Sequence, residues 1–442
     1  MSAFAAESTL TSAVGETRLD LATGLGATPA GLVDHPVFFT GFLARPDVAA
    51  AGLLAVADVA MARYADSGLA RYVSSLDPIV TASGDRLRFE SFSGCNGVHA
   101  RFDLLGNGVE GGVVGFGTTN VDVNQPLRTA LARVGRDDLL HLAVGDEALT
   151  ASSLDETHVE GKVRLPDRWV RGCAEVPALA ARMEPKATLR GAAISQFLGD
   201  LPTVAPPGPV LRLVTVGSTV RTTAHALPGS MAITGTSRLK AASRISRFAT
   251  TLTVYGGPYD TSAWVFDVPG GRLTLVLSPG PYRAFSGEGG LLTLLADPDA
   301  ERHGRTLLGH LAWNPSIDES LIVEQLGLSS REVRAGLGWL AASGRVGYDL
   351  TERAYFHRDL PVDAEQVLRR SPRLRGARRL VDRGAVTTDG AGWLVAGDHD
   401  TYRVEGRRCS CPWETEHHGS RGPCKHLLAV TIMATEPAPP AT

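Results

Sequence analysis

Alternation of polar and apolar residues predicts several β-strands in the first 200 residues. DRLRFESF, from Asp85, and VHARFDL, from Val98, alternate on either side of SGCNG, a pattern typical of two strands joined by a turn. The later segment VVGFGTTNVDVNQPLRTALARV predicts a strand and then a helix that Pro126 opens. LLHLAVGDEALTASSL predicts a further pair of strands.

Helical segments accompany these strands. An alanine-rich stretch from Val48 predicts a core helix, and a second helix is expected over residues 176–199. The stretch from Val48 is interrupted by Asp58 and is too short to span a bilayer, so we expect no contact with a membrane. Residues 1–200 are therefore predicted to form an α+β domain.

A proline-rich segment follows this region. LPTVAPPGP, residues 201–209, holds four prolines in nine residues, which stiffens the backbone and removes hydrogen-bond donors. We interpret it as a linker between domains. LRLVTVGSTVRTTA, TTLTVYGG, SAWVFDV and RLTLVLS come next, each short, rich in β-forming residues and bounded by glycine or proline. Residues 210–300 are predicted to form a separate β-rich domain.

The pattern becomes helical over residues 301–362. GRTLLGHLAW, DESLIVEQLG and SSREVRAGLGWLAASG predict three short helices, and RVGYDLTERAYFHRDL predicts two strands around a charged turn. Ser329 and Glu332 have the spacing of a capping box at the start of the third helix. Three helices followed by a two-stranded wing resemble the winged-helix family.

This resemblance implies one of two uses. The third helix of such folds can enter the major groove of DNA, which would place Arg331 and Arg334 at bases or phosphates, while the wing touches the backbone. Winged helices also serve as modules for protein–protein contact, and Glu332 and Gly336 leave few residues that could recognise bases. Both uses remain open.

A basic connector is predicted over residues 363–384. It carries Arg375, Arg378 and Arg379 within a run of seven arginines that is opposed by a single Asp382. Such a helix could neutralise phosphates, or it could be a solvated face that pairs with acidic neighbours. The basic residues of this chain are nearly all arginine, so arginine richness alone does not decide between these interpretations.

Composition narrows the class of protein. The 442 residues carry a formal net charge of −3, which excludes a uniformly basic nucleic-acid coat. The N-terminus lacks the basic and apolar segments of a secretory signal, and five cysteines are few for a disulfide scaffold. We therefore expect a cytoplasmic protein whose cysteines are free or hold a metal.

Three of the five cysteines lie close together near the C-terminus. Cys409 and Cys411 are followed, after twelve residues, by Cys424 and His426. Two such pairs separated by a loop supply the thiolate and imidazole ligands that zinc prefers in a tetrahedral site. A segment this small buries little apolar surface, so one structural Zn²⁺ is expected to contribute much of its folding energy, about 10 to 16 kcal/mol in comparable sites.

These four residues, preceded by TYRV and followed by LLAV, resemble the SWIM zinc finger. The resemblance covers residues 385–435 and implies a ββα unit whose zinc ligands are Cys409, Cys411, Cys424 and His426. It also implies interaction with DNA or protein. His417 and His418 lie in the loop, away from the ligand positions of the family. A Pro-rich tail, residues 436–442, follows.

No catalytic motif is apparent. GNGVEGG satisfies GxGxxG, but a strand pattern follows it instead of a helix, and there is no phosphate loop or nucleophile elbow. We therefore expect a multidomain α+β protein that acts as a non-enzymatic adaptor for a protein partner, with an ATPase as one class that the resemblance implies. The alternatives are a sequence-tolerant DNA-binding protein, or an enzyme whose site lies in residues 1–300.

Overall fold

The computed structural model describes residues 7–13, 16–62, 78–145, 167–202, 210–217, 219–280, 285, 289–311, 313–360, 371–390 and 392–435. Several sequence predictions lie outside these ranges: the second strand after Val144, residues 203–209 of the linker, residues 363–370 of the connector and the tail 436–442. None of the helices within the ranges combines the length and apolar composition that a bilayer crossing requires.

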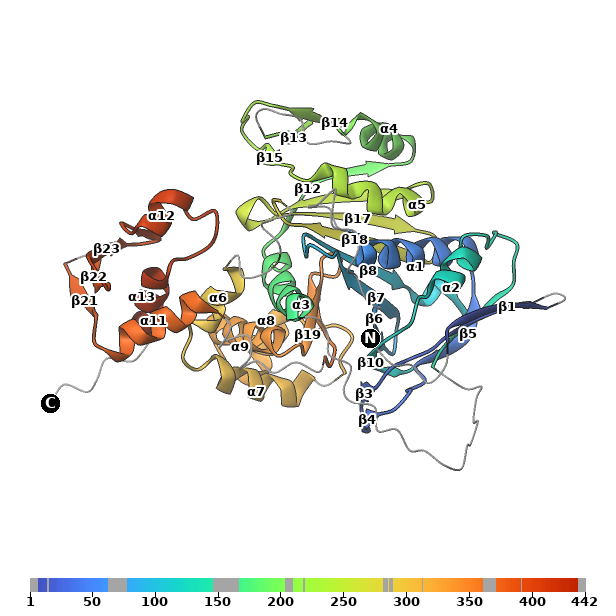
Figure 1. Ribbon diagram of the computed structural model, residues 1–442, viewed down its shortest axis with the longest axis horizontal. Helices are drawn as coiled ribbons and strands as arrows, with labels where there is room; N and C mark the ends of the chain where they lie inside the picture. The colour runs from blue at the N-terminus through green and yellow to red at the C-terminus, as the bar shows by residue number, and fades with distance from the viewer. Residues whose placement is uncertain are drawn as a thin grey trace.

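One large sheet is the main element of the described part of the chain, and its strand order is β12-β16-β17-β18-β8-β7-β6-β10-β3-β4 (Figure 1). Its neighbouring strands are antiparallel throughout. In chain order the strands are β3 (Gly26–Thr28), β4 (Gly31–Val33), β6 (Ile79–Ser83), β7 (Leu87–Phe92), β8 (Val98–Leu104), β10 (Phe116–Asn120), β12 (Glu184–Arg190), β16 (Thr251–Gly256), β17 (Ser262–Val268) and β18 (Gly271–Leu277).

This sheet contradicts the predicted domain boundary at residues 201–209. β18 pairs with β8 along its whole length, from Gly271 opposite Leu104 to Leu277 opposite Val98. Strands from both sides of the boundary therefore share one hydrogen-bonded ladder and one hydrophobic core. Proline richness is a local property and carries no information about which strands pair across it.

Helix α1 (Pro46–Met61) packs on one face of the sheet, against β7, β8 and β18 (Figure 1). This helix is the core helix that the alanine-rich stretch predicts, and nearly all of its side chains are buried. Gly52 lies over Phe102, so close that a Cβ there would be 2.4 Å from the ring. Small residues thus allow the helix to approach the sheet closely.

Two smaller sheets flank the large one. The first has the order β1-β2-β11-β5-β9, in which β2 and β11 are parallel. The second has the order β14-β13-β15. The strands are β1 (Thr9–Ala13), β2 (Glu16–Leu21), β5 (Phe39–Leu43), β9 (Val109–Val114), β11 (Leu140–Val144), β13 (Arg212–Val216), β14 (Thr219–Thr223) and β15 (Met231–Ala232).

Two of the helix predictions in this region have different outcomes. Helix α2 (Gln125–Leu131) is present and has Pro126 in its first turn, with the Asn124 side chain accepting from the Leu127 amide at 2.9 Å. The single helix predicted over 176–199 is wrong, because α3 (Asp167–Ala180) and α4 (Ala192–Asp200) are separated by β12. Strand pairing with β16 overrides the helical pattern there, and Pro185 disfavours a continuous helix.

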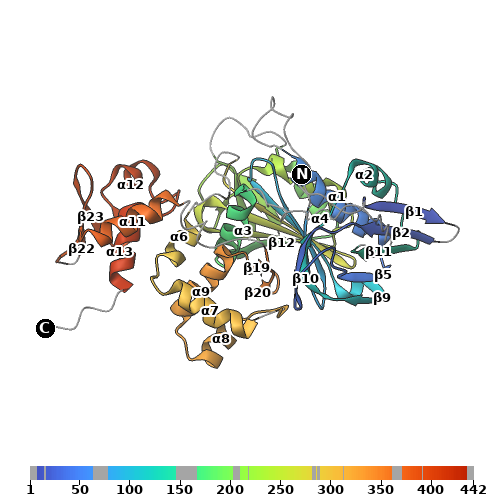
Figure 2. The same cartoon turned by 60° about the horizontal axis from the view of Figure 1, so that its bottom comes forward.

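The predicted three helices and two strands are present in residues 300–357. They are α7 (Ala300–Leu311), α8 (Glu319–Leu326), α9 (Ser330–Ala342), β19 (Val346–Asp349) and β20 (Ala354–His357), preceded by α6 (Gly290–Leu295). The capping box is confirmed: the Ser329 hydroxyl accepts from the Glu332 amide, and the Ser329 amide donates to the Glu332 carboxylate. These helices lie between the sheet and the C-terminal part of the chain (Figures 1 and 2).

Part of the second face of the large sheet is polar and is covered by the two strands of this unit. Arg88 and Glu90 on β7 lie opposite Asp103 and Arg101 on β8, and all four are buried. β19 and β20 close over them, so that Arg101 donates to Asp349 at 2.8 Å. The alternation in β7 and β8 is therefore real, but its polar face is buried against another unit instead of facing water.

The C-terminal part has its own sheet, with the order β21-β22-β23-β24, and lies at one end of the molecule (Figure 1). α11 packs against α13, and both contribute to a hydrophobic core with residues of α6 and α3. The elements are α11 (Pro372–Asp382), β21 (Val386–Asp389), β22 (Gly392–Ala396), β23 (Thr401–Glu405), β24 (Arg408–Cys409), α12 (Pro412–His417) and α13 (Lys425–Thr435). The predicted ββα unit is thus the centre of a larger assembly.

Candidate metal centre

Three structural features position the cysteines and the histidine. Cys409 ends β24 and pairs with Val404 of β23, while Cys411 is the N-cap residue of α12. Cys424 precedes α13, and His426 lies in its first turn. All four are buried, with at most 6% of the residue surface exposed. A two-stranded turn and two helix starts therefore converge on one point.

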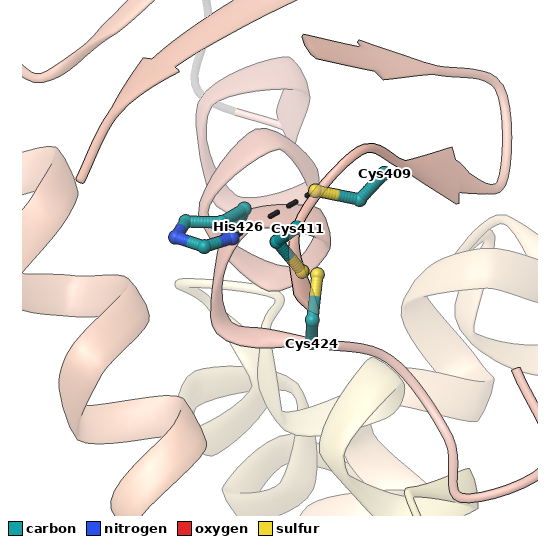
Figure 3. Close-up of side chains that lie close together, drawn as sticks. All are labelled: Cys409, Cys411, Cys424 and His426. Atoms are coloured by element: carbon teal, nitrogen blue, oxygen red, sulfur yellow. Dashed lines mark hydrogen bonds between the residues drawn. The ribbon is translucent and has the colours of Figure 1, made fainter. Parts of the chain in front are cut away.

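The ligand atoms have the spacing of a tetrahedral zinc site. The three sulfurs and one imidazole nitrogen all lie within 4.8 Å of one another, and the Cys409 sulfur is 3.7 Å from Nδ1 of His426 (Figure 3). Zinc–sulfur bonds of about 2.3 Å and zinc–nitrogen bonds of about 2.0 Å place tetrahedral ligand atoms about 3.5 to 3.8 Å apart. The four side chains are therefore arranged to bind one zinc ion.

The sulfurs of this cluster shift one another's pKa values in opposite directions. The contact with the Cys411 sulfur raises the pKa of Cys409, and the same contact lowers the pKa of Cys411. The Leu427 amide donates to the Cys424 sulfur at 3.3 Å, in the first turn of α13. Backbone amides and a helix N-terminus stabilise negative charge on sulfur.

The other candidate ligands lie outside this cluster. His417 packs edge-on against Trp413, with ring centres 4.4 Å apart, and neither His417 nor His418 joins the four ligand atoms. Cys173 is buried in the N-terminal region, where burial raises the pKa of its thiol to about 12. Cys95 lies beside the Ser93 hydroxyl at 3.4 Å. These positions agree with their interpretation as loop, core and turn residues.

The structure limits the predicted nucleic-acid contacts of α9. Arg334 donates to Glu319 at 2.6 Å, and Arg331 lies 3.5 Å from Asp297. Beyond its first turn the helix is almost entirely buried, and Gly336 packs against α7. Arg358, directly after β20, is also buried, against Glu90. Only the start of this helix faces solvent, so most of it could not reach a DNA groove.

The basic helix is different. Arg375, Arg378 and Arg379 are exposed on α11, and in the described part of the chain no carboxylate lies within ion-pair distance of them. The sequence prediction of a basic surface therefore stands for these three residues.

Sequence reasoning did not identify a second cluster. Asp297, Asp299 and His303 place three potential ligand atoms within 4.8 Å, and the spacing DPDAERH is the signal that could have found them. Asp299 already pairs with Arg302 at 3.1 Å, however, and Asp297 lies near Arg331. Existing ion pairs thus account for these carboxylates.

Comparison with known proteins identifies the finger. The SWIM zinc finger family matches residues 393–434, which include all four ligands. This segment is therefore a SWIM zinc finger, arranged to bind one zinc ion through Cys409, Cys411, Cys424 and His426. The match covers the finger alone.

No curated protein matches the sequence. Among solved structures, the proliferating cellular nuclear antigen from Entamoeba histolytica is similar at 7% identity and a TM-score of 0.32, over 55% of this chain and 100% of that chain. A likeness this weak supports no conclusion about fold or function.

Proposed function

We propose that this chain is a non-enzymatic adaptor whose SWIM finger binds a protein partner. The observation that carries the proposal is the metal centre: four protein side chains complete the coordination of zinc and leave no position for a substrate. A closed site of this kind shapes a surface instead of catalysing a reaction. SWIM fingers are generally interaction modules, and this one lies at an end of the molecule (Figure 1).

The way the finger is attached supports this role. α11 and α13 pack together, and Pro423 lies against Gly289, where a Cβ would be 2.6 Å from the proline ring. The finger is therefore presented on a packed support, which reduces the conformational entropy lost when a partner binds. An ATPase is one class of partner that fits an adaptor without its own catalysis.

A capture experiment tests the adaptor. The tagged full-length protein, the Cys411→Ser variant and the Cys95→Ser control are purified from the native cytosol, and the partners are identified by mass spectrometry. A stoichiometric partner retained by the wild type and by Cys95→Ser, but lost from Cys411→Ser, supports the proposal. An identical partner list for all three proteins, or neither a partner nor DNA retained at low salt, contradicts it.

A second candidate function is sequence-tolerant DNA binding. The three exposed arginines of α11, residues 375, 378 and 379, favour it, since they are positioned to neutralise phosphates. DNA affinity should then fall steeply with salt, and the triple alanine variant should flatten this dependence. Arg305→Ala, which removes an arginine paired with Glu301 on α7, is the matched control. Binding that is independent of salt would exclude this function.

A further inference from the structure

A cavity of about 430 Å³ lies between α11 and the zinc finger. Its walls include Arg379 from α11, His399 and Tyr402 from the finger sheet and its loop, and Lys425 and His426 from the start of α13. The cavity therefore borders the zinc site directly. The spacing of the zinc ligands in the sequence does not predict it.

The charges around this cavity favour an anion. Arg379 has no carboxylate within ion-pair distance in the described ranges, and Lys425 lies 3.1 Å from Asp398. That single carboxylate is shared, because Arg383 also contacts Asp398 at 3.1 Å. Hydrogen bonds from Lys425 and Arg383 lower the pKa of Asp398, which therefore stays ionised but balances only one cation. Arginine and lysine together are a common phosphate-binding pair.

His426 offers a hydrogen-bond donor that the protein leaves unused. Its Nδ1 faces the Cys409 sulfur, and its Nε2 points away from the three sulfurs (Figure 3). The residue is only 4% exposed, yet Nε2 has no hydrogen-bond partner among the described residues. A histidine that binds zinc through one nitrogen carries its proton on the other, and usually donates it to an acceptor nearby. An acceptor from outside the chain would complete this arrangement.

The remaining walls have room for more than a phosphate. Tyr402 and Trp413 contribute aromatic surface, and Pro372 and Pro412 contribute apolar surface. A cavity of several hundred cubic ångströms with apolar walls and a few polar groups is typical of a small-molecule site. Cationic groups beside aromatic rings are also the combination that holds a nucleotide.

We propose that this cavity binds the phosphate ester of a nucleotide, either free or within a single strand. Arg379 and Lys425 contact the phosphate, and His426 donates to the ligand through Nε2. The attached nucleoside lies against the aromatic and apolar wall. The inference does not depend on the adaptor role, because a free nucleotide would occupy the site without any macromolecular partner.

The test uses the full-length, zinc-loaded protein and calorimetry with adenosine 5′-monophosphate, with adenosine as the probe that lacks the phosphate. We expect the monophosphate to bind at least about tenfold tighter than adenosine, because adenosine lacks the phosphate that accepts the charged hydrogen bonds. Arg379→Ala should weaken it about tenfold, whereas Arg378→Ala, on the same helix but outside the cavity, should change it less than about twofold. Zinc content is measured for each variant to confirm that the finger stays folded.

Two further measurements locate the ligand and its source. In cobalt-substituted protein, the monophosphate should shift the visible absorption bands, because His426 would contact both metal and ligand. Competition by a short fluorescent single strand shows that a nucleic-acid phosphate can also enter, and its failure to compete assigns the site to free nucleotides. If the single strand binds through Arg379 and the monophosphate does not bind, the site is assigned to nucleic acid.

The inference is overturned if neither the monophosphate nor the single strand binds. It is also overturned if Arg378→Ala and Arg379→Ala weaken binding equally, since equal effects indicate diffuse electrostatic attraction. Partner capture is measured with the same Arg379→Ala variant. A protein that retains its partner but binds no phosphate probe refutes the cavity and leaves the adaptor proposal intact.

Discussion

Arg358 and Glu90 form a buried ion pair between residues that are 268 positions apart in the chain. One guanidinium nitrogen of Arg358 lies 2.9 Å from both carboxylate oxygens of Glu90, and His99 adds a contact to the same carboxylate at 3.1 Å. A second nitrogen of Arg358 donates to the carbonyl of Cys173 at 2.9 Å. The segment that resembles a winged helix is therefore fixed to the large sheet, not a free DNA-reading module.

Breaking this pair should destabilise the protein strongly. Glu90→Gln leaves the buried charge of Arg358 without its counterion, for which we expect a loss of about 3 to 5 kcal/mol in the free energy of unfolding. Chemical denaturation measures it. The matched control is Glu184→Gln, which removes a carboxylate paired with Lys186 at the surface and should change stability little. Equal effects of the two variants would show that the buried pair is unimportant.

Two glycines of α7 should respond to alanine in opposite directions. A Cβ at Gly304 would lie 2.4 Å from the Trp339 ring and 3.2 Å from the Gly336 carbonyl, so Gly304→Ala should cost about 1 to 3 kcal/mol. Gly309 is exposed on the same helix with nothing within 4 Å, so Gly309→Ala should stabilise the protein by about 0.5 to 1 kcal/mol. Thermal unfolding of both variants measures the difference, and a shift in the same direction would contradict the packing of α7 on α9.

Stability should also depend on the protonation of His357. Burial, and to a smaller degree Arg345, lowers the pKa of His357 from 6.5 to about 4. The unfolded chain therefore binds a proton at this residue more readily than the folded chain does. The stability that neutral His357 contributes above pH 6.5 is lost as the pH falls toward 4, by up to about 3 kcal/mol. His357→Phe keeps a ring against Trp313, whose centre lies 4.6 Å away, but cannot be protonated. Denaturation at several pH values should show a flatter profile for this variant, and parallel profiles would refute the assignment.

The sequence predicts well those features that depend on neighbouring residues. The capping box of Ser329 and Glu332 is present as expected, and Pro126 lies in the first turn of α2, because each feature depends on residues within one helical turn. The ligand spacing from Cys409 to His426 likewise lies within one short segment, so the metal site could be found from its pattern.

Features that depend on distant contacts were missed. The pairing of β18 with β8 joins residues on both sides of the predicted linker, and no local pattern contains that information. Arg358 is buried by its contact with Glu90, 268 positions away, which no local pattern indicates. The DNA-binding interpretation places Arg331 and Arg334 at bases or phosphates, but Asp297 and Glu319 lie beside them in the fold.

X-ray absorption at the zinc edge, combined with elemental analysis of the purified protein, tests the zinc finger most directly. We predict one zinc per chain, bound by three sulfurs at about 2.3 Å and one nitrogen at about 2.0 Å, with the zinc lost in Cys411→Ser and retained in Cys95→Ser. A protein without stoichiometric zinc, or a metal bound by oxygen ligands, would contradict the assignment of Cys409, Cys411, Cys424 and His426 as a closed structural site.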